Sequence, residues 1–251
     1  MKNDSANAKM IIMAAGKGTR LHSEQHRMPK VLREAAGQPL LLRILDRVSF
    51  LKKENIVIIV GYKGELVEQA AGPDYRYAWQ REQLGTGHAV MQAVPELAGY
   101  DGPVMVGSGD MPLITRDTYK GMLDAHINEG NACTMLAYVS DKDMRFGRIV
   151  RDETGAFEQV VEDGDCTPEQ KKITELNAGV YVFDAQTLVE GLSQLSTDNA
   201  QNEYYLTDVP SWIQRRGGKI GIFRTKGEYE GLGVNTQEDL DLVSRILSEE
   251  D

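Results

Sequence analysis

Apolar runs of strand length alternate with amphipathic, helix-like stretches along the first half of this 251-residue chain. Strands are predicted at residues 9–14, 55–61, 75–79 and 103–106, and helices at 40–52, 63–71 and 86–97. In segment 40–52 the apolar residues recur at helical spacing. Because strands that alternate with helices are joined by crossover connections, the pattern predicts an α/β fold with a mostly parallel sheet flanked by helices.

The pattern becomes richer in β-structure after residue 130. Buried strands are predicted at 131–139 and 177–183, and a hairpin is predicted from segments 146–150 and 157–162. Further helices are predicted at 185–195, 206–215 and 236–247. No Pro/Gly/Ser-rich tract, repeat or low-complexity run separates these parts. We therefore expect one α/β domain that carries an inserted β-rich lobe.

The excess of acidic over basic residues in the chain argues against two classes of partner. A formal net charge of −10 disfavours a general binder of nucleic acid or of anionic membranes, although it is compatible with a local basic pocket. The two cysteines, Cys133 and Cys166, form no CxxC pair, and the first apolar stretch is too short for a signal sequence or a membrane span. We expect a cytoplasmic protein with no nucleic-acid or membrane partner.

Three loops that leave predicted strands carry unusual side chains, and they cover residues 14–30, 80–88 and 107–113. In open parallel sheets, ligands bind beyond the carboxyl ends of the strands, where such loops meet. The coincidence predicts one ligand site built from all three loops.

The first loop begins within the sequence MIIMAAGKGTR, which covers residues 10–20. Glycine lets a ligand approach backbone N–H groups, and the nearby cations suit phosphate oxygens. Ile11 and Leu21 stand where the NTPase loop and the dinucleotide fingerprint need glycines, so neither of those classes is supported. Lys30, behind the rigid Pro29, can serve as a point charge near a phosphate. A glycine turn with solvated charges is the alternative.

The other two loops suggest base recognition and metal binding. Gln80 and Gln83 can read a base edge through their amide donors and acceptors, and the glycines at 85 and 87 let the backbone pass close to a planar ring. Asp110 follows a central strand, where a carboxylate can ligate Mg²⁺. A turn-forming aspartate is the alternative. His22 and His26 lack a third soft ligand nearby, so no zinc site is predicted.

With these loops the chain resembles the sugar-nucleotide pyrophosphorylases, and more narrowly the uridyltransferase domain of bacterial N-acetylglucosamine-1-phosphate uridyltransferase. The resemblance runs from about Met10 to Leu240. The broad superfamily is marked by AAGKGTR and PKVL, and the narrower family by QLGTGHA, GDMPL, FGRIVR, VVED, LNAGVYVF and NAQNEYYLTD. This resemblance implies a Rossmann-like nucleotidyltransferase fold with a smaller β-rich sugar-binding lobe.

The resemblance also implies how residues 8–251 are organised and which residues bind substrates. It places a nucleotide-binding part at about 8–130, a sugar-binding part at about 131–235 and a C-terminal helix at 236–249 of a single domain. The implied catalytic, phosphate-holding residues are Arg20 and Lys30. The implied nucleotide contacts are Ala14, Ala15, Gly16, Gln80, Gln83, Gly85 and Thr86. The implied Mg²⁺ ligands are Asp110 and Asn235, and the implied sugar contacts are Gly147, Glu162, Asn177 and Thr207.

The implied reaction joins UTP and N-acetylglucosamine 1-phosphate into UDP-N-acetylglucosamine and pyrophosphate, with Mg²⁺ and without a general base. Ser108 and Ala178 stand where the family commonly has tyrosine and threonine, so the same chemistry with another sugar 1-phosphate is an alternative. A non-catalytic regulator that binds nucleotide sugars is a third reading, which the presence of the phosphate and metal residues disfavours. The segment 21–29 is longer than usual in the family, which bears on how Lys30 is presented.

No hexapeptide repeat follows residue 240, so no left-handed β-helix acetyltransferase domain is expected in this chain. The fused family trimerises through that domain. We therefore expect a monomer or a small homo-oligomer.

Overall fold

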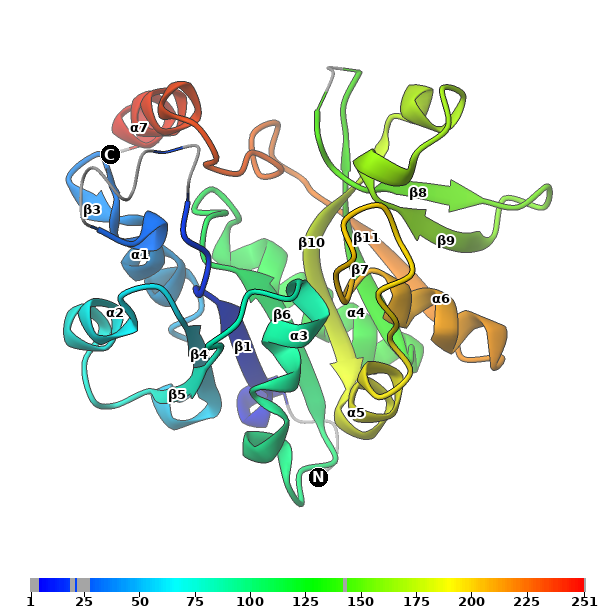
Figure 1. Cartoon of the computed structure of the whole chain (residues 1–251), viewed down its shortest axis with the longest axis horizontal. Coiled ribbons are helices and arrows are strands. Elements are labelled where there is room, and N and C mark those ends of the chain that lie inside the picture. The colour runs from blue at the N-terminus through cyan, green and yellow to red at the C-terminus, as the bar shows by residue number, and fades with distance from the viewer. Residues whose placement is uncertain (1–4, 19–20, 22–27, 142–143, 251) are drawn as a thin grey trace.

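The computed structural model describes residues 5–18, 21, 28–141 and 144–250, and its centre is a mixed β-sheet (Figure 1). In spatial order the strands of this sheet are β11 (Ile220–Arg224), β7 (Cys133–Val139), β10 (Glu175–Asp184), β6 (Pro103–Ser108), β1 (Lys9–Met13), β4 (Ile56–Val60) and β5 (Arg76–Trp79). Neighbours along this order run parallel except at β10, which is antiparallel to β6 and β7. The predicted mostly parallel sheet is confirmed.

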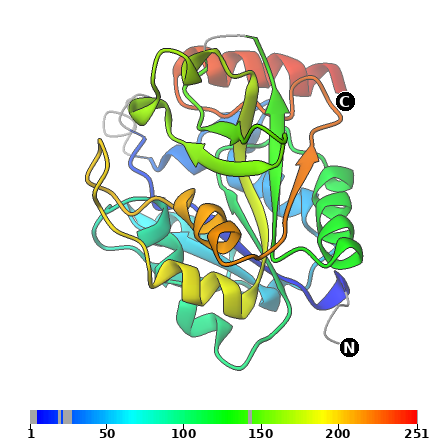
Figure 2. The ribbon, with the colours of Figure 1, turned by 90° about the vertical axis from the view of Figure 1, so that its right-hand side faces the viewer.

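Helices cover both faces of the sheet. One face packs against α1 (Leu40–Arg47), α2 (Gly64–Ala71) and α4 (Arg116–Glu129), and the other against α3 (Thr86–Met91), α5 (Ala185–Leu192) and α6 (Asp208–Arg215). Figure 2 shows the sheet edge-on, with α4 on one side and α5 and α6 on the other. Because both faces are buried, the central strands β1, β4 and β6 are largely continuous apolar runs rather than alternating ones.

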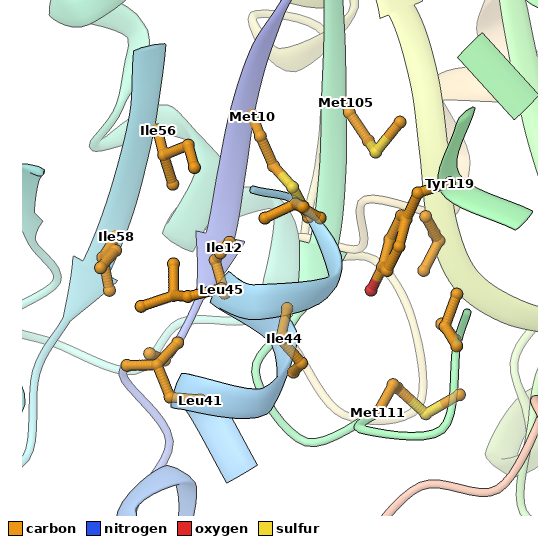
Figure 3. Packing of buried hydrophobic residues seen from close by; sticks show 14 of the residues in the cluster. Met10, Ile12, Leu41, Ile44, Leu45, Ile56, Ile58, Met105, Met111 and Tyr119 are labelled. Atoms are coloured by element: carbon orange, nitrogen blue, oxygen red, sulfur yellow. The ribbon is translucent and has the colours of Figure 1, made fainter. Parts of the chain in front are cut away.

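Successive side chains of each strand enter opposite cores. In β1, Met10 and Ile12 face the core beneath α1, whereas Ile11 faces the core beneath α3 and α5. Figure 3 shows Met10 and Ile12 beside the apolar face of α1. Each fully buried aliphatic side chain of this kind contributes about 2 kcal/mol through removal of its surface from water.

Strand β10 joins the lobe to the main sheet. The lobe contains β8 (Arg148–Arg151) and β9 (Phe157–Val161), an antiparallel pair that attaches where Arg148 lies opposite Leu176 of β10. This confirms the predicted hairpin. The pairing of β10 with β7 shifts between Asn177 and Tyr181, around Gly179, whose φ is +70°. A β-bulge changes the direction in which side chains point. Here the shift lies in the wall of a cavity that Asn177, Gly179 and Tyr181 line.

Several elements differ from the sequence-based expectation. Helix α4 and strand β11 were not predicted, and neither was the small hairpin of β2 (Glu34–Ala35) and β3 (Gln38–Pro39). The predicted helix 86–97 divides into α3 and a 3-10 helix, Val94–Leu97, because Pro95 in its first turn lacks a backbone N–H. Other 3-10 helices cover Ser5–Asn7, Lys30–Leu32, Lys53–Asn55, Asp163–Asp165 and Gln170–Lys172.

Helix α7 (Gln237–Glu250) packs over the β2–β3 hairpin and shares a surface cavity with residues 144–146 of the lobe. Its apolar side packs with the β2–β3 hairpin in a third core, which includes Ala35, Leu113, Val234, Leu240, Val243 and Leu247. Within the described ranges, every helix is too short or too polar to cross a lipid bilayer.

Glu230 anchors the segment between β11 and α7 to the start of α4. Its side chain is 3% exposed. One carboxylate oxygen accepts hydrogen bonds from the Thr115 N–H (2.9 Å) and hydroxyl (2.7 Å) and from the Thr118 hydroxyl (2.6 Å). The other accepts from the N–H groups of Lys226 and Gly227, both at 2.9 Å. The N-terminus of a helix favours a negative charge at this place.

The hydrogen bonds keep this buried carboxyl ionised. Burial by itself opposes ionisation, but the donors on Thr118, Gly227 and Thr115 hold the pKa of Glu230 below its ordinary value of 4.5. A group with a lowered folded-state pKa adds stability that is present above the pKa of the unfolded chain. That stability is lost as the pH falls through the lowered value.

We therefore predict that Glu230→Gln lowers the free energy of unfolding by about 2 kcal/mol at neutral pH, because the amide NH₂ faces N–H or O–H donors. Denaturant unfolding should show the difference, and the gap to the wild-type protein should narrow as the pH falls below 4.5. The exposed Glu228→Gln is the matched control. Equal stability of the two variants would contradict the role given to Glu230.

Candidate functional site

Two adjoining cavities open beyond the carboxyl ends of β1 and β6. The first has a volume of about 250 Å³ and the second about 190 Å³. Met13, Thr86, Ser108 and Asp110 line both of them. The two spaces therefore meet at the ends of the central strands, at the edge of the sheet where the sequence predicts a ligand site.

The first cavity is walled by residues of all three predicted loops. All seven residues predicted to contact a nucleotide line it, together with Lys30: these are Ala14, Ala15, Gly16, Gln80, Gln83, Gly85 and Thr86. Arg20, the other predicted phosphate-holding residue, lies outside the described residues, as do His22 and His26. The structure thus brings together every described member of the predicted nucleotide set.

The loop after β1 is held by the end of β4. The Ala14 N–H donates to the Ile59 carbonyl at 2.8 Å, and the Tyr62 N–H donates to the Ala15 carbonyl at 3.3 Å. A Cβ on Gly61 would come within 2.9 Å of the Ala15 Cβ, so the two backbones need glycine at this point. A Cβ on Gly16 would meet nothing within 4 Å, and Gly16 lines the first cavity.

The loop after β5 is docked on the segment that contains the NAQNEYYLTD motif. Gly85 has a φ of +110°, and a Cβ there would lie 2.6 Å from the Tyr204 carbonyl oxygen. The Gly87 N–H donates to that same oxygen at 2.7 Å, and the Leu206 N–H donates to the Thr86 hydroxyl at 3.0 Å. Close packing against Tyr204 therefore requires the glycines of this loop, a reason that the sequence alone did not give.

A cation and two oxygen ligands meet where the cavities join. The Lys30 ammonium forms an ion pair with Asp110 and donates to the Asn235 amide oxygen at 2.8 Å. Burial opposes ionisation of Asp110, but the Lys30 charge and the Ser108 hydroxyl hold the pKa of this carboxyl below its ordinary value. The carboxylate is therefore charged at neutral pH.

These two oxygens fit a hard cation such as Mg²⁺. A carboxylate and an amide oxygen already converge on one positive centre, the Lys30 ammonium. Among the described residues there is no group of three or more His, Cys, Asp or Glu side chains that could hold a metal alone. Mg²⁺ commonly takes one or two protein oxygens and completes its shell with water and substrate phosphates.

The second cavity is polar on the side of the lobe. The four predicted sugar contacts, Gly147, Glu162, Asn177 and Thr207, all line it. The Thr207 hydroxyl donates to Glu162 at 2.8 Å, and burial together with nearby aspartates raises the pKa of Glu162. The Asn177 amide donates to the Tyr181 hydroxyl at 2.6 Å. Glu162 and Asn177 are thus held from the protein side.

Two departures from the family pattern also lie in this wall. Ser108 lines both cavities and Ala178 lines the second. Each is smaller than the residue that the resemblance implies at its position, so both leave more room at this wall.

Sequence reasoning missed Arg145 and His88. Arg145 lines the second cavity and also a neighbouring space of about 590 Å³ beside α7. Within the described part of the chain it makes no hydrogen bond or ion pair. The signal available for it was a cation directly before FGRIVR. His88, in QLGTGHA, contacts the Gln80 side chain with its ring, a contact that only the folded loop reveals.

Comparison with known proteins shows which family the chain belongs to. Residues 9–228 match the family model described as Nucleotidyl transferase. The bifunctional protein GlmU of Streptococcus thermophilus (strain ATCC BAA-491 / LMD-9) is 42% identical over 237 residues, which cover 94% of this chain and 51% of that protein. The bifunctional protein GlmU of Geobacillus sp. (strain WCH70) is 41% identical over 239 residues, with coverage of 95% and 51%. The chain spans about half the length of these relatives.

A solved structure shares the fold. A putative glucose-1-phosphate thymidylyltransferase from Bacillus anthracis, crystallised in complex with a sucrose, has a TM-score of 0.75 at 20% sequence identity. The match covers 95% of this chain and 94% of that one. With the family model extending over most of its length, the chain belongs to the nucleotidyl transferase family.

Proposed function

We propose that this protein is an Mg²⁺-dependent uridyltransferase that forms UDP-N-acetylglucosamine and pyrophosphate from UTP and N-acetylglucosamine 1-phosphate. The observation that carries the proposal is the meeting of the two cavities at Asp110. Every described residue of the implied nucleotide set lines one cavity, and every residue of the implied sugar set lines the other. A nucleotide and a sugar phosphate bound in these spaces would have their phosphates adjacent.

The polar groups of the second cavity support an amino-sugar phosphate as the second substrate. Glu162 offers a carboxyl oxygen toward the space, and Asn177 offers an amide held in place by Tyr181. Hydroxyl and acetamido groups of a sugar provide both donors and acceptors for such partners. The motifs FGRIVR, VVED and LNAGVYVF supply residues of this wall.

The chemistry requires alignment rather than proton transfer. An oxygen of the sugar 1-phosphate attacks the α-phosphorus of UTP in line, and pyrophosphate leaves. Because this oxygen is already ionised, no general base is needed, and catalysis depends on positioning and on neutralisation of charge. Lys30 supplies a positive charge at the junction of the cavities.

Asp110 and Asn235 would hold Mg²⁺, which when bound neutralises phosphate charge as a Lewis acid. In this proposal Arg20 is a second cation for the nucleotide phosphates.

The direct test is pyrophosphate release with Mg²⁺, with the four common nucleoside triphosphates crossed against a panel of sugar 1-phosphates. We expect strong release with UTP and N-acetylglucosamine 1-phosphate alone. Release with UTP and a different sugar would keep the chemistry and assign the altered specificity to the smaller side chains Ser108 and Ala178. No release with any pair, from folded protein, would leave a non-catalytic regulator.

Asp110→Asn should lower kcat by about a hundredfold or more, because it removes a charge that no other described carboxylate replaces at the junction. Turnover should be followed across a Mg²⁺ titration, with circular dichroism and thermal unfolding as checks of folding. Asp124→Asn, an exposed position of α4, is the matched control and should behave as the wild-type protein. Wild-type Mg²⁺ dependence in Asp110→Asn would remove Asp110 from the mechanism.

Arg145 is proposed to attract the sugar 1-phosphate into the second cavity. It is an exposed cation in the wall of that cavity, and it does not line the first. Arg145→Ala should raise the KM for the sugar 1-phosphate by about fivefold and leave the KM for UTP unchanged, as expected when one exposed charge contact to a phosphate is lost. Lys172→Ala, also exposed but outside both cavities, is the control. A rise confined to the KM for UTP would contradict this assignment.

A further inference from the structure

We infer that His88 sets the base selectivity of the first cavity by fixing the orientation of the Gln80 amide. The fixed amide presents an oxygen to the base and so selects a pyrimidine with a ring N–H, uracil or thymine, over cytosine. The inference rests on the proposed function, because it concerns the same nucleotide site.

The described part of the protein makes hydrogen bonds with the amide nitrogen of Gln80 but not with its amide oxygen. The side chain is 4% exposed and lines the first cavity. Its Nε2 donates to the Gly85 carbonyl at 3.1 Å and lies 3.2 Å from His88 Nδ1. Its Oε1 accepts no hydrogen bond from any described residue. Both amide hydrogens are therefore held by the protein, and the acceptor is left for a ligand.

The tautomer of His88 follows from its two amide neighbours. Gln92 Nε2 lies 3.2 Å from His88 Nε2 and donates to the His88 carbonyl at 3.0 Å. A neutral imidazole has one acceptor nitrogen, so it can accept from only one of the two amides. Gln80 is buried, whereas Gln92 is half-buried and has access to water. An unsatisfied buried hydrogen costs more, so Nδ1 accepts from Gln80 and Nε2 carries the proton.

His88 is itself held by the segment behind it. Its ring stacks on Tyr204 with a centroid distance of 6.3 Å and an interplanar angle of 29°. The preceding Gly87 N–H donates to the Tyr204 carbonyl at 2.7 Å. A chain of contacts thus runs from Tyr204 through His88 and Gln80 to the cavity.

An acceptor at this wall discriminates between pyrimidines by simple complementarity. N3 of uracil and of thymine carries a hydrogen that can be donated to Gln80 Oε1. N3 of cytosine carries a lone pair, which would face the same oxygen and repel it. If the Gln80 amide turned over, its NH₂ would favour cytosine instead, and His88 opposes that turn by accepting one of the amide hydrogens.

The test is the ratio of kcat/KM for UTP to that for CTP, measured with the same sugar 1-phosphate. His88→Phe keeps a ring beside Tyr204 but removes the acceptor. We expect the ratio to fall by about fivefold to tenfold, the value of one lost hydrogen bond. The loss is partial because the Gly85 carbonyl still accepts one amide hydrogen. His88→Asn, whose Oδ1 is as many bonds from the backbone as Nδ1, should restore most of the ratio.

Gln92→Ala is the matched control, because it removes the other amide on the His88 ring without affecting the Gln80 contact. Its ratio should equal that of the wild-type protein. Thermal unfolding monitors folding, and His88→Leu serves as a second variant without an acceptor if the Phe variant does not fold.

A wild-type ratio in a folded variant without the acceptor would overturn the role of His88 and leave the proposed function intact. Absence of turnover by the wild-type protein with every nucleotide would instead reject the proposed function.

Discussion

The contact of Lys30 with Asp110 and Asn235 is the interaction on which the arrangement of the site depends. It joins a 3-10 helix after the first loop, the end of β6 and the segment before α7, which are distant in sequence. The Lys30 and Asp110 side chains are largely withdrawn from water, with 12% and 21% of their surface exposed, and charges in such places need a paired, hydrogen-bonded partner. The ammonium and the carboxylate each meet this condition for the other, and the pair lies where the two cavities join. Removal of either charge would leave its partner in an unfavourable environment.

Strand β10 gives the second cavity its stable support. It pairs with β6 and β7 in the main sheet and also with β8 of the lobe, so the lobe shares a strand with the sheet. The shift in pairing after Asn177 lies at the cavity wall, next to Ala178 and Gly179. A rigid strand that passes between the two parts can hold polar side chains more precisely than a flexible loop. This explains why the residues predicted to contact a sugar, which are far apart in sequence, meet in one cavity.

The sequence predicted the sheet and most of its helices because strands buried on both faces are continuous apolar runs. Helix α4 was missed because its buried positions include the polar Thr118 and His126, which weaken the apolar spacing. Its end signals were nevertheless present: Thr115 is the N-cap and accepts a hydrogen bond from the Thr118 N–H, and Gly130 ends the helix with a φ of +63°. Strand β11 is a short edge strand with half-buried residues, so its pattern was weak as well.

The sequence predicted many of the residues that line the cavities and the strands that they follow. It did not predict which of these residues contact one another. Asp110 could be placed at the exit of a strand, yet its pairing with Lys30, 80 residues away, depends on the fold. The hydrogen-bond donors to Glu230 come from two segments that only the tertiary structure brings together. No local sequence motif therefore predicts these hydrogen bonds. The same holds for Gln80. The orientation of its buried amide can be explained only from the folded structure, in which the Gly85 carbonyl and the His88 ring accept the amide hydrogens.

A common principle links these groups. Gln80, Glu162 and Asp110 are each held by protein partners on one side and line a cavity on the other. Their orientation is therefore fixed before a ligand enters, and binding does not have to supply the ordering free energy again. In a reaction that needs alignment rather than a base, this pre-organisation is the main contribution that a protein can make. On the proposed function, the residues that hold these groups, among them His88, Thr207 and Ser108, would contribute to activity by fixing that orientation.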